Sequence, residues 1–356
     1  MIKIVIGLFM VMMFSNIVNG WIGGSYVIFQ EYLPVFLLYI ILVNIVTDES
    51  KLLSLFNLFI FCAILMSVHG IQQMEYGVGW TGTNAYQNRI RYIGTMNDPN
   101  DLALFLVFSF ILLIYFINAT SNKAYKLYYL FAGLVLLYGI VLTNSRGGLL
   151  ALIIALFLYY KSKKNIIITS VFIGVLILVF VNYASRLTEI STEESSASGR
   201  LDAWYTGLQL FKSNPIFGVG YGNFTEYNTL TAHNSYVLVL SELGIIGYYL
   251  WFMLLGATYY KIYLIYNYDK KNNESNNLSH VLFCALSSVV IAIFFLSRSY
   301  NIVFIIILAL MYAYSQRNTE LVNHPELTAV NYKKWFVLTL TSIVFLFVAT
   351  KILFLI

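Results

Sequence analysis

The chain has 356 residues, of which 60% are hydrophobic and only 10% are charged. A soluble domain carries about 25% charged residues, and the 21 basic and 16 acidic side chains are too few to cover a globule of 40.7 kDa. This composition excludes a cytosolic enzyme, a secreted disulfide scaffold and a disordered segment, and it indicates a chain solvated mainly by lipid. The net charge is a modest +5, and Cys62 and Cys284 lie far apart in apolar runs, as is typical of small buried hydrophobes.

Eleven apolar runs are candidates for helices that cross the roughly 30 Å hydrocarbon core of a bilayer. In chain order they cover about residues 2–19, 26–46, 52–69, 101–118, 127–143, 148–160, 165–183, 236–260, 281–297, 302–315 and 335–355. The first run has features of a secretory signal, but the ten runs that follow favour an uncleaved helix. The sequence therefore predicts an all-α polytopic membrane protein whose residues 1–356 form a single integral membrane domain.

Lysine and arginine fall on opposite sides of the predicted membrane. With a cytoplasmic N-terminus, twelve of the fourteen lysines lie inside, as the positive-inside rule requires, and only Lys212 and Lys351 lie outside. Six of the seven arginines lie outside: Arg89, Arg91, Arg146, Arg186, Arg200 and Arg298. Because the rule treats the two residue types alike, this separation indicates that the outer face needs guanidinium groups specifically.

Two predicted outer segments are long enough to hold a site, at residues 70–100 and 184–235. The second lies between the seventh and eighth spans and carries three basic against five acidic side chains. It is therefore not a general polybasic surface, and its arginines look individually placed.

The first motif reads TNSRGG over residues 143–148 and joins two predicted helices at the outer face. Its glycines permit a tight turn, and Ser145 can cap the helix that follows. In a structural interpretation Arg146 reaches lipid headgroups. In a functional one it completes an anion site, because helix N-termini carry partial positive charge and arginine offers phosphate a bidentate fork.

Residues 91–103 contain a second helix start, in which Asp98, Pro99 and Asp101 supply the cap, the first helical position and an acid in the first turn. This interpretation leaves Arg89 and Arg91 unexplained.

In a third motif, Arg200 and Trp204 share a face if the segment is helical. That arginine is either structural, stacked on the ring, or a phosphate ligand.

Residues 218–224 read GVGYGNF, but no strand precedes them and no βαβ unit surrounds them, so we expect a tightly turned loop and no nucleotide site. His233 is expected to open a helix and to share a face with Tyr236, Val237, Leu240, Gly244 and Gly247, while Glu242 points the opposite way. Alone, such a histidine is typical of a structural role. Beside outer arginines, acid–base chemistry at an anionic leaving group is favoured.

Several kinds of site are not indicated. The sequence has no Asp-x-Asp pair, no His-x-x-x-His and no cysteine cluster, so no metal site is expected, and it has no serine nucleophile elbow. Ionisable residues in mid-membrane are few, which disfavours a proton-coupled transporter. No nucleic-acid partner is expected.

The ordered set of motifs resembles the O-antigen ligase and polymerase family over roughly residues 85–260. The set comprises SRGG at 145–148, DPN at 98–100, Arg200 with Trp204, Asn214-Pro215 before the glycine run, and His233-Asn234 leading to Glu242-Leu243-Gly244. This resemblance implies a GT-C-like helical fold in the bacterial inner membrane and a site that faces outside. It also implies an undecaprenyl-pyrophosphate-linked oligosaccharide as donor, with no metal, cofactor or nucleotide sugar.

By position, the resemblance makes Arg146, Arg200 and His233 the expected catalytic groups. We expect Arg91, Arg186, Asn234, Tyr236 and Arg298 to bind substrate. The predicted activity is a surface polysaccharide polymerase that transfers glycan to an acceptor hydroxyl with inversion. The alternatives are a ligase acting on lipid A core or protein, and a lipid-linked oligosaccharide flippase or exporter, although a flippase predicts charges along a path through the spans. Other polysaccharide-assembly membrane proteins are candidate partners.

Overall fold

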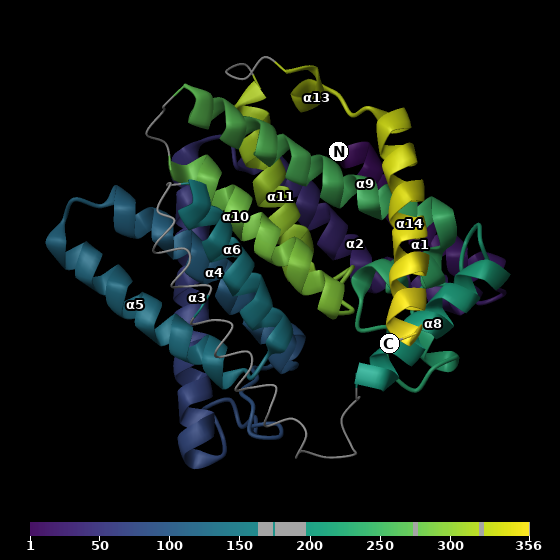
Figure 1. Cartoon of the computed structure of the whole chain (residues 1–356), viewed down its shortest axis with the longest axis horizontal. Coiled ribbons are helices and arrows are strands. Elements are labelled where there is room, and N and C mark those ends of the chain that lie inside the picture. Colours follow the sequence, from purple (N-terminus) through teal and green to yellow (C-terminus); the bar gives the residue numbers. More distant parts are fainter. Residues whose placement is uncertain (163–173, 175–196, 273–276, 320–323, 356) are drawn as a thin grey trace. The chain divides into compact units, whose positions relative to one another are not determined.

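The structure is a computed structural model that describes residues 1–162, 174, 197–272, 277–319 and 324–355 (Figure 1). These residues form helices and no strand, apart from two isolated β-bridges, Val78 with Asn84 and Tyr86 with Arg89. The chain divides into two compact units. Unit 1 comprises Met1–Glu49, Glu193–Tyr268 and Ile293–Ile356, and unit 2 comprises Ser50–Thr192 and Asp269–Ala292.

The prediction of an all-α polytopic membrane protein is confirmed. Ten of the eleven predicted spans coincide with helices, and the other, at 165–183, lies outside the described residues except for Gly174. By length and composition, seven helices of the described part can cross a membrane, and two shorter apolar ones, α1 (Ile2–Val18) and α11 (Ile302–Arg317), accompany them.

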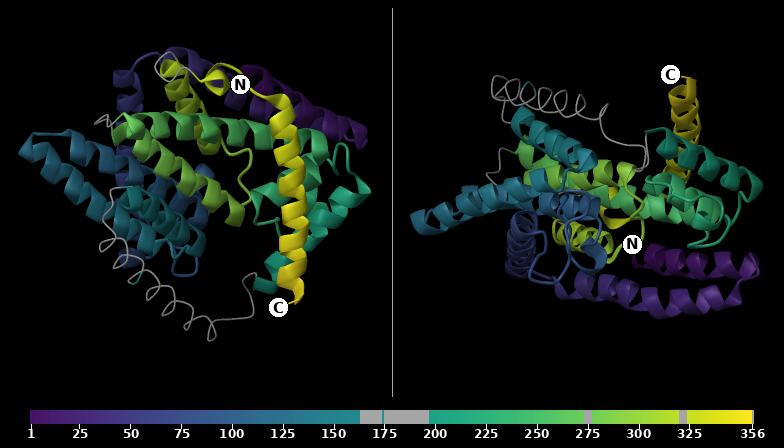
Figure 2. Two further views of the ribbon diagram at one scale, coloured as in Figure 1. Left: turned by 45° about the horizontal axis from the view of Figure 1, so that its top comes forward. Right: turned by 90° about the horizontal axis from the view of Figure 1, so that it is seen from below.

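Unit 1 contains the N-terminal hairpin, the long helix α9 and the C-terminal helices. Its elements are α1 (Ile2–Val18), α2 (Ile22–Ile45), α8 (Ala197–Ser213), η2 (Phe224–Glu226), most of α9 (Ser235–Lys271), η3 (Ile293–Phe295), α11 (Ile302–Arg317), α13 (Pro325–Thr328) and α14 (Tyr332–Leu355). Helix α2 packs against both α1 and α11, and α14 packs against α8. Figure 2 shows α1 and α2 running side by side.

Unit 2 is built around α4. Its elements are α3 (Glu49–Tyr76), η1 (Gly94–Met96), α4 (Pro99–Ala119), α5 (Lys123–Leu142), α6 (Arg146–Ser162) and α10 (Asn277–Ala292). Helix α4 contacts α5, α6 and α10, so it is apolar on all sides and mostly buried. Both predicted helix starts are confirmed, since Asp98 accepts the Asn100 amide at 2.7 Å and Ser145 accepts the Gly148 amide at 3.1 Å.

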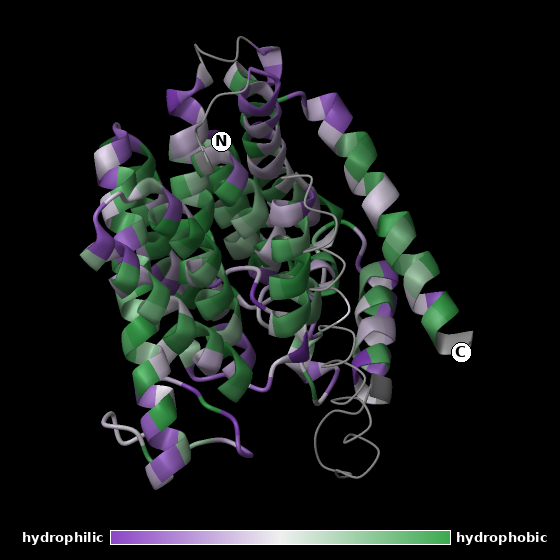
Figure 3. Ribbon diagram, turned by 60° about the vertical axis from the view of Figure 1, so that its left-hand side comes forward, coloured by the Kyte–Doolittle hydropathy of each residue, from purple (hydrophilic) through white to green (hydrophobic). Residues whose placement is uncertain are grey.

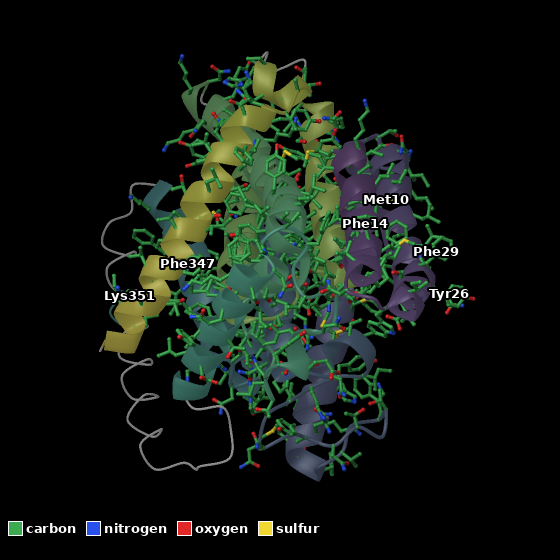
Figure 4. The ribbon with its side chains drawn as sticks, turned by 90° about the vertical axis from the view of Figure 1, so that its right-hand side faces the viewer. Met10, Phe14, Tyr26, Phe29, Phe347 and Lys351 are labelled. Carbon is green, nitrogen blue, oxygen red and sulfur yellow. The ribbon has the colours of Figure 1, made fainter. Side chains whose placement is uncertain are left out.

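Large apolar side chains cover the outer surfaces of several helices. Tyr26 and Phe29 of α2 point away from the ribbon, as does Met10 of α1 (Figure 4). Figure 3 shows hydrophobic colouring along the helices and hydrophilic colouring toward their ends and the loops. An apolar exterior of this extent is unfavourable in water but is the surface that lipid solvates.

Two lysines make polar contacts at one end of unit 1. Lys261 donates to the Leu327 carbonyl and Lys334 Nζ lies 2.9 Å from Glu326 Oε1. Helix α8 and the C-terminus lie at the opposite end (Figure 1). The predicted span ended at residue 260, but α9 continues to Lys271, so Lys261 is buried within the helix and does not lie in a loop.

Helix α9 is broken at Gly244, whose φ of 61° and ψ of −162° are not helical. An unbroken helix would bond the amides of Ile245 and Ile246 to the carbonyls of Ser241 and Glu242. The break removes both bonds and leaves two amides and two carbonyls to be satisfied in a buried setting.

The glycine loop, residues 214–223, supplies those four partners. The bonds are Val219 N to Ser241 O (3.0 Å), Gly220 N to Glu242 O (3.0 Å), Ile245 N to Pro215 O (2.9 Å) and Ile246 N to Ile216 O (3.4 Å). The backbones approach so closely that a Cβ on Gly244 would lie 2.4 Å from the Ile216 carbonyl, and one on Gly218 would lie 2.3 Å from the Glu242 carbonyl carbon. The loop is therefore docked on the break, and its Val219 and Gly220 amides are already used.

Replacing Gly244 with alanine should unfold this junction. The new Cβ meets backbone at a positive φ, so we expect a loss of more than about 3 kcal/mol in the free energy of unfolding. Gly222→Ala is the matched control, because Gly222 also has a positive φ of 79° but nothing within 4 Å of a new Cβ, and it should cost only about 1–2 kcal/mol. Thermal unfolding of both detergent-solubilised variants measures the difference, and equal midpoints would contradict the proposed docking.

Candidate functional site

The start of α9 places His233 and Asn234 differently from the predicted helix. His233 has a left-handed φ of 46° and precedes the helix, which begins at Ser235. Asn234 is the cap, since its Oδ1 accepts the amides of Tyr236 at 2.9 Å and Val237 at 3.2 Å. The predicted continuous face that joined His233 to Gly244 was therefore wrong, because the chain turns at one end of that face and breaks at the other.

Ser235 fastens the start of α9 to the segment that carries Arg298. Its hydroxyl donates to the Leu296 carbonyl at 2.6 Å and accepts the Arg298 amide at 3.0 Å, while its carbonyl accepts the Ser299 hydroxyl at 3.1 Å. The Ser299 carbonyl in turn accepts the indole N–H of Trp251 at 3.0 Å. The structure thus brings the backbone of Arg298 beside His233-Asn234, although more than sixty residues separate them in sequence.

Helix α8 adds Arg200 to the same end of unit 1. Trp204, one turn after Arg200, is buried, and its ring lies 5.3 Å from that of Phe294, which is 6.0 Å from the ring of Tyr236. Further along α8, Gly207 lies so close to α9 that a Cβ there would be 2.4 Å from an α9 side chain. The elements carrying Arg200, His233, Tyr236 and Arg298 therefore form one packed assembly.

Tyr221 of the glycine loop contacts Tyr32 and Tyr300, and none of these three tyrosines was singled out from the sequence. The Tyr221 hydroxyl donates to that of Tyr32, and the Tyr221 ring lies 5.2 Å from the Tyr32 ring and 5.0 Å from the Tyr300 ring. Burial, followed by the neighbouring Tyr32 phenol, raises the pKa of Tyr221, and burial with the Glu242 carboxyl raises that of Tyr300. Both phenols therefore remain neutral at physiological pH.

Glu242 is buried, and its carboxyl accepts the backbone amides of Phe224 and Gly222. Glu242 thus holds the end of the glycine loop and the start of η2, a structural role that was not predicted from the sequence. The signal that could have identified it is the Glu-Leu-Gly order, which places an acid two residues before the helix break.

In unit 2, Arg89 ties together two of the motifs. Its Nε donates to the Thr143 carbonyl at 2.9 Å and its Nη2 to Asn100 Oδ1 at 2.8 Å. The helix starts that it joins are closely packed, because a Cβ on Gly148 would lie 2.6 Å from the Ala103 Cβ. Arg89 is therefore a structural link that sequence reasoning noted without assigning.

Two predicted site residues of unit 2 have different environments. Arg91 Nε donates to the Asn84 carbonyl at 2.9 Å, and its guanidinium lies 5.5 Å from the centre of the Tyr86 ring. Arg146 is exposed at the first position of α6. Arg186 lies outside the described residues. Within the described ranges no three His, Cys, Asp or Glu side chains gather as a metal site.

Removing the Ser235 hydroxyl should destabilise the assembly around α9. Ser235→Ala leaves the Leu296 carbonyl and the Arg298 amide without their partner, at a cost of about 1–3 kcal/mol. The control Ser213→Ala removes an exposed hydroxyl that bonds to two carbonyls of its own helix and to the side chain of the neighbouring Asn214, and it should change stability by less than about 0.5 kcal/mol. Thermal unfolding compares them, and an unchanged midpoint for Ser235→Ala would show that Arg298 is not held in this way.

Comparison with known proteins gives two matches. Residues 131–252 match the family model described as O-Antigen ligase. The chain is 23% identical over 227 residues to an O-antigen polymerase of Salmonella muenchen, an alignment that covers 57% of this chain and 56% of the relative, so the chain spans a little over half of that relative's length. Together with the ordered motifs, these matches confirm the predicted resemblance to the O-antigen ligase and polymerase family.

Proposed function

We propose that this protein is a membrane glycosyltransferase that polymerises a surface polysaccharide from a lipid-pyrophosphate-linked glycan. The two matches support activity of the O-antigen polymerase or ligase kind. The observation that carries the proposal is the Ser235 junction, which holds the backbone of Arg298 beside His233-Asn234 at the predicted outer end of unit 1. Guanidinium groups and an imidazole are the residue types that transfer from an anionic leaving group needs.

In this reaction the acceptor sugar hydroxyl attacks the anomeric carbon from the face opposite the pyrophosphate. The new C–O bond forms as the anomeric carbon–phosphate oxygen bond breaks, and the anomeric centre inverts. The lipid pyrophosphate leaves with the bonding electron pair, so negative charge grows on its bridging oxygen. Arg200 and Arg298 offer planar forks to that charge, which arginine can stabilise at any physiological pH.

His233 accepts the acceptor hydroxyl's proton as the attack proceeds, because imidazole can take and release a proton near neutral pH. The left-handed turn at His233 separates its side chain from the helical row of α9, and Asn234 and Ser235 fix the backbone directly after that turn. Asn234 and Tyr236 then act chiefly by positioning this end of α9.

We propose the same class of role, pyrophosphate binding, for Arg146, and subsidiary binding roles for Arg91 and Arg186. Arg146 is exposed at a helix N-terminus, so its guanidinium and the helix dipole point to anion binding together. Arg91 already donates to a loop carbonyl, so we expect its contribution to be smaller. We also propose that the N-terminus is cytoplasmic and that the protein resides in the bacterial inner membrane, with polysaccharide-assembly proteins as partners.

A ligase that moves the finished glycan to lipid A core or protein is the second candidate, favoured by the description of the matching family model. Reconstitution in vesicles with a lipid-linked repeat unit separates the activities. Longer lipid-linked glycans identify a polymerase, glycan on a new acceptor identifies a ligase, and glycan movement without new bonds identifies a flippase.

Alanine variants test the assigned groups. Arg200→Ala, His233→Ala and Arg146→Ala should each lower the transfer rate by about 10²–10³, by analogy with lost oxyanion donors, while the protein remains folded. Lys212→Ala is the matched control, because Lys212 is an exposed cation on α8 and should leave the rate unchanged. Gel analysis of the polysaccharide and single-turnover transfer measure the effect, and normal chains from any of the three variants would remove that residue from the mechanism.

A further inference from the structure

Unit 1 has a shallow cavity of about 260 Å³ that the proposed transfer chemistry does not use. Its lining residues are Trp21, at the turn between α1 and α2, and Asn223, Glu226 and Tyr227, which lie on or next to η2. The cavity therefore joins the N-terminal hairpin to the glycine loop, two segments that are about two hundred residues apart in sequence.

The Trp21 indole packs directly against Gly24, where there is no side chain to displace it. The ring lies so close over Gly24 that a Cβ there would be 2.3 Å from the indole Cε3. The Trp21 amide bonds to the Asn16 carbonyl at 2.8 Å. The side chain is nevertheless 48% exposed, and its indole N–H makes no hydrogen bond to the described part of the chain. Trp21 thus presents a fixed ring and a free donor.

The facing wall is also fixed. Asn223 Nδ2 donates to the Val219 carbonyl at 2.9 Å. The Glu226 amide donates to the Asn223 carbonyl at 3.1 Å, and the Tyr227 amide donates to the Phe224 carbonyl at 3.1 Å. Asn223 therefore keeps its Oδ1 available for an outside donor.

Two contacts fasten this wall to the α1–α2 hairpin. Asn19 Nδ2 donates to the Gly218 carbonyl at 3.0 Å, and Ser15 Oγ accepts the Tyr221 amide at 3.2 Å. The Tyr221 hydroxyl adds a third link to α2 through Tyr32. The cavity is therefore formed before any ligand binds, which lowers the entropy cost of binding.

The lining groups suit a sugar ring. Aromatic rings offer apolar faces to the C–H faces of a sugar, while the carboxylate and amide oxygens accept its hydroxyl protons. The Tyr227 ring is 57% exposed, and neither its hydroxyl nor the Glu226 carboxylate bonds to any described residue. The cavity is smaller than the roughly 300–1,000 Å³ of sites for drug-sized ligands, so it matches one ring. The carboxylate, with no cation in the lining, disfavours phosphate and acidic sugars.

We propose that Trp21, Asn223, Glu226 and Tyr227 form a subsite that holds one uncharged sugar ring of a surface glycan. None of the four lining residues is assigned to transfer, so the subsite affects how firmly the glycan is held and does not enter the bond-making step. The assignment of this glycan as the substrate of the enzyme rests on the proposed function.

Binding by the full-length, detergent-solubilised protein tests the subsite. The probe is the oligosaccharide of one or two repeat units released by mild acid from the surface polysaccharide of the cells in which the protein is native. Saturation-transfer NMR should detect it on the wild-type protein. Trp21→Ala should weaken binding about tenfold, equivalent to about 1.4 kcal/mol, and Trp21→Phe, which retains a ring, should restore part of it.

Tyr26→Ala is the matched control, because Tyr26 lies in the first part of α2, five residues after Trp21, and is 61% exposed but does not line the cavity. It should bind like the wild type. Equal binding by Trp21→Ala and the wild type, or no binding by the wild type, overturns the subsite and leaves Trp21 and Tyr227 as aromatic anchors at the membrane interface.

Transfer assays on the same variants separate this proposal from the proposed function. A higher KM for the glycan acceptor at unchanged kcat, with shorter polysaccharide in cells, is the expected result for Trp21→Ala. If the wild type and Trp21→Ala both transfer glycan and bind the probe equally well, the subsite is overturned and the proposed function stands. If the wild-type protein binds the probe but forms no glycosidic bond, and Trp21→Ala loses that binding, the subsite is supported and the proposed function is overturned.

Discussion

The unit that carries His233 depends on one constraint, that a backbone polar group removed from water needs a partner. Helix α9 breaks at Gly244, and the two helical bonds lost there are replaced by four bonds to residues 215–220. The replacement works only because glycine occupies both sides of the contact, where backbone meets backbone at distances that no Cβ would allow. An isolated break in lipid would cost several kcal/mol for each unsatisfied group. The glycine loop is therefore part of the helix packing, and everything attached to it has a fixed position.

This fixed loop positions several side chains of different chemistry. Tyr221 of the loop bonds to Tyr32, and Glu242 accepts the amides of Gly222 in the loop and Phe224 at the start of η2. The buried Glu242 carboxyl thus holds backbone amides, whereas the Tyr221 and Tyr32 hydroxyls bond to each other. The arginines differ from one another in their environments. Arg89 is committed to the Thr143 carbonyl and the Asn100 side chain, whereas Arg146 lies exposed at a helix start. The arginines that the lysine–arginine separation singled out are therefore not equivalent, since Arg89 links two helix starts and Arg146 is exposed to solvent.

The sequence predicted the helices well, because a spanning helix satisfies its own backbone and is visible as an apolar run. It also predicted the caps at Asp98 and Ser145, because a cap depends on residues within one turn of each other. It failed where the structure depends on distant partners. The break at Gly244 is stabilised by a loop about thirty residues earlier, the burial of Lys261 depends on the Leu327 carbonyl, and Ser235 acquires its role only when residues 296–299 reach it. The helical-wheel argument for His233 assumed that this residue is helical, but its φ is +46°, which lies outside the right-handed helical region.

The same non-local bonds suggest how holding a glycan and transferring it can be separated within one small unit. Transfer requires charge compensation in a site with little water, which arginines and a histidine around the start of α9 are suited to provide. Retaining an uncharged polymer requires stacking area and hydroxyl acceptors, which Trp21, Tyr227 and Glu226 are suited to provide. Positive and negative side chains would weaken each other if they occupied one cavity, because the carboxylate that favours hydroxyls repels pyrophosphate. The glycine loop connects the two regions through backbone, since it ends beside the cavity on one side and is bonded to α9 on the other. On our proposals, the rigid docking of that loop on the helix break keeps the two kinds of chemistry in register without mixing their charges.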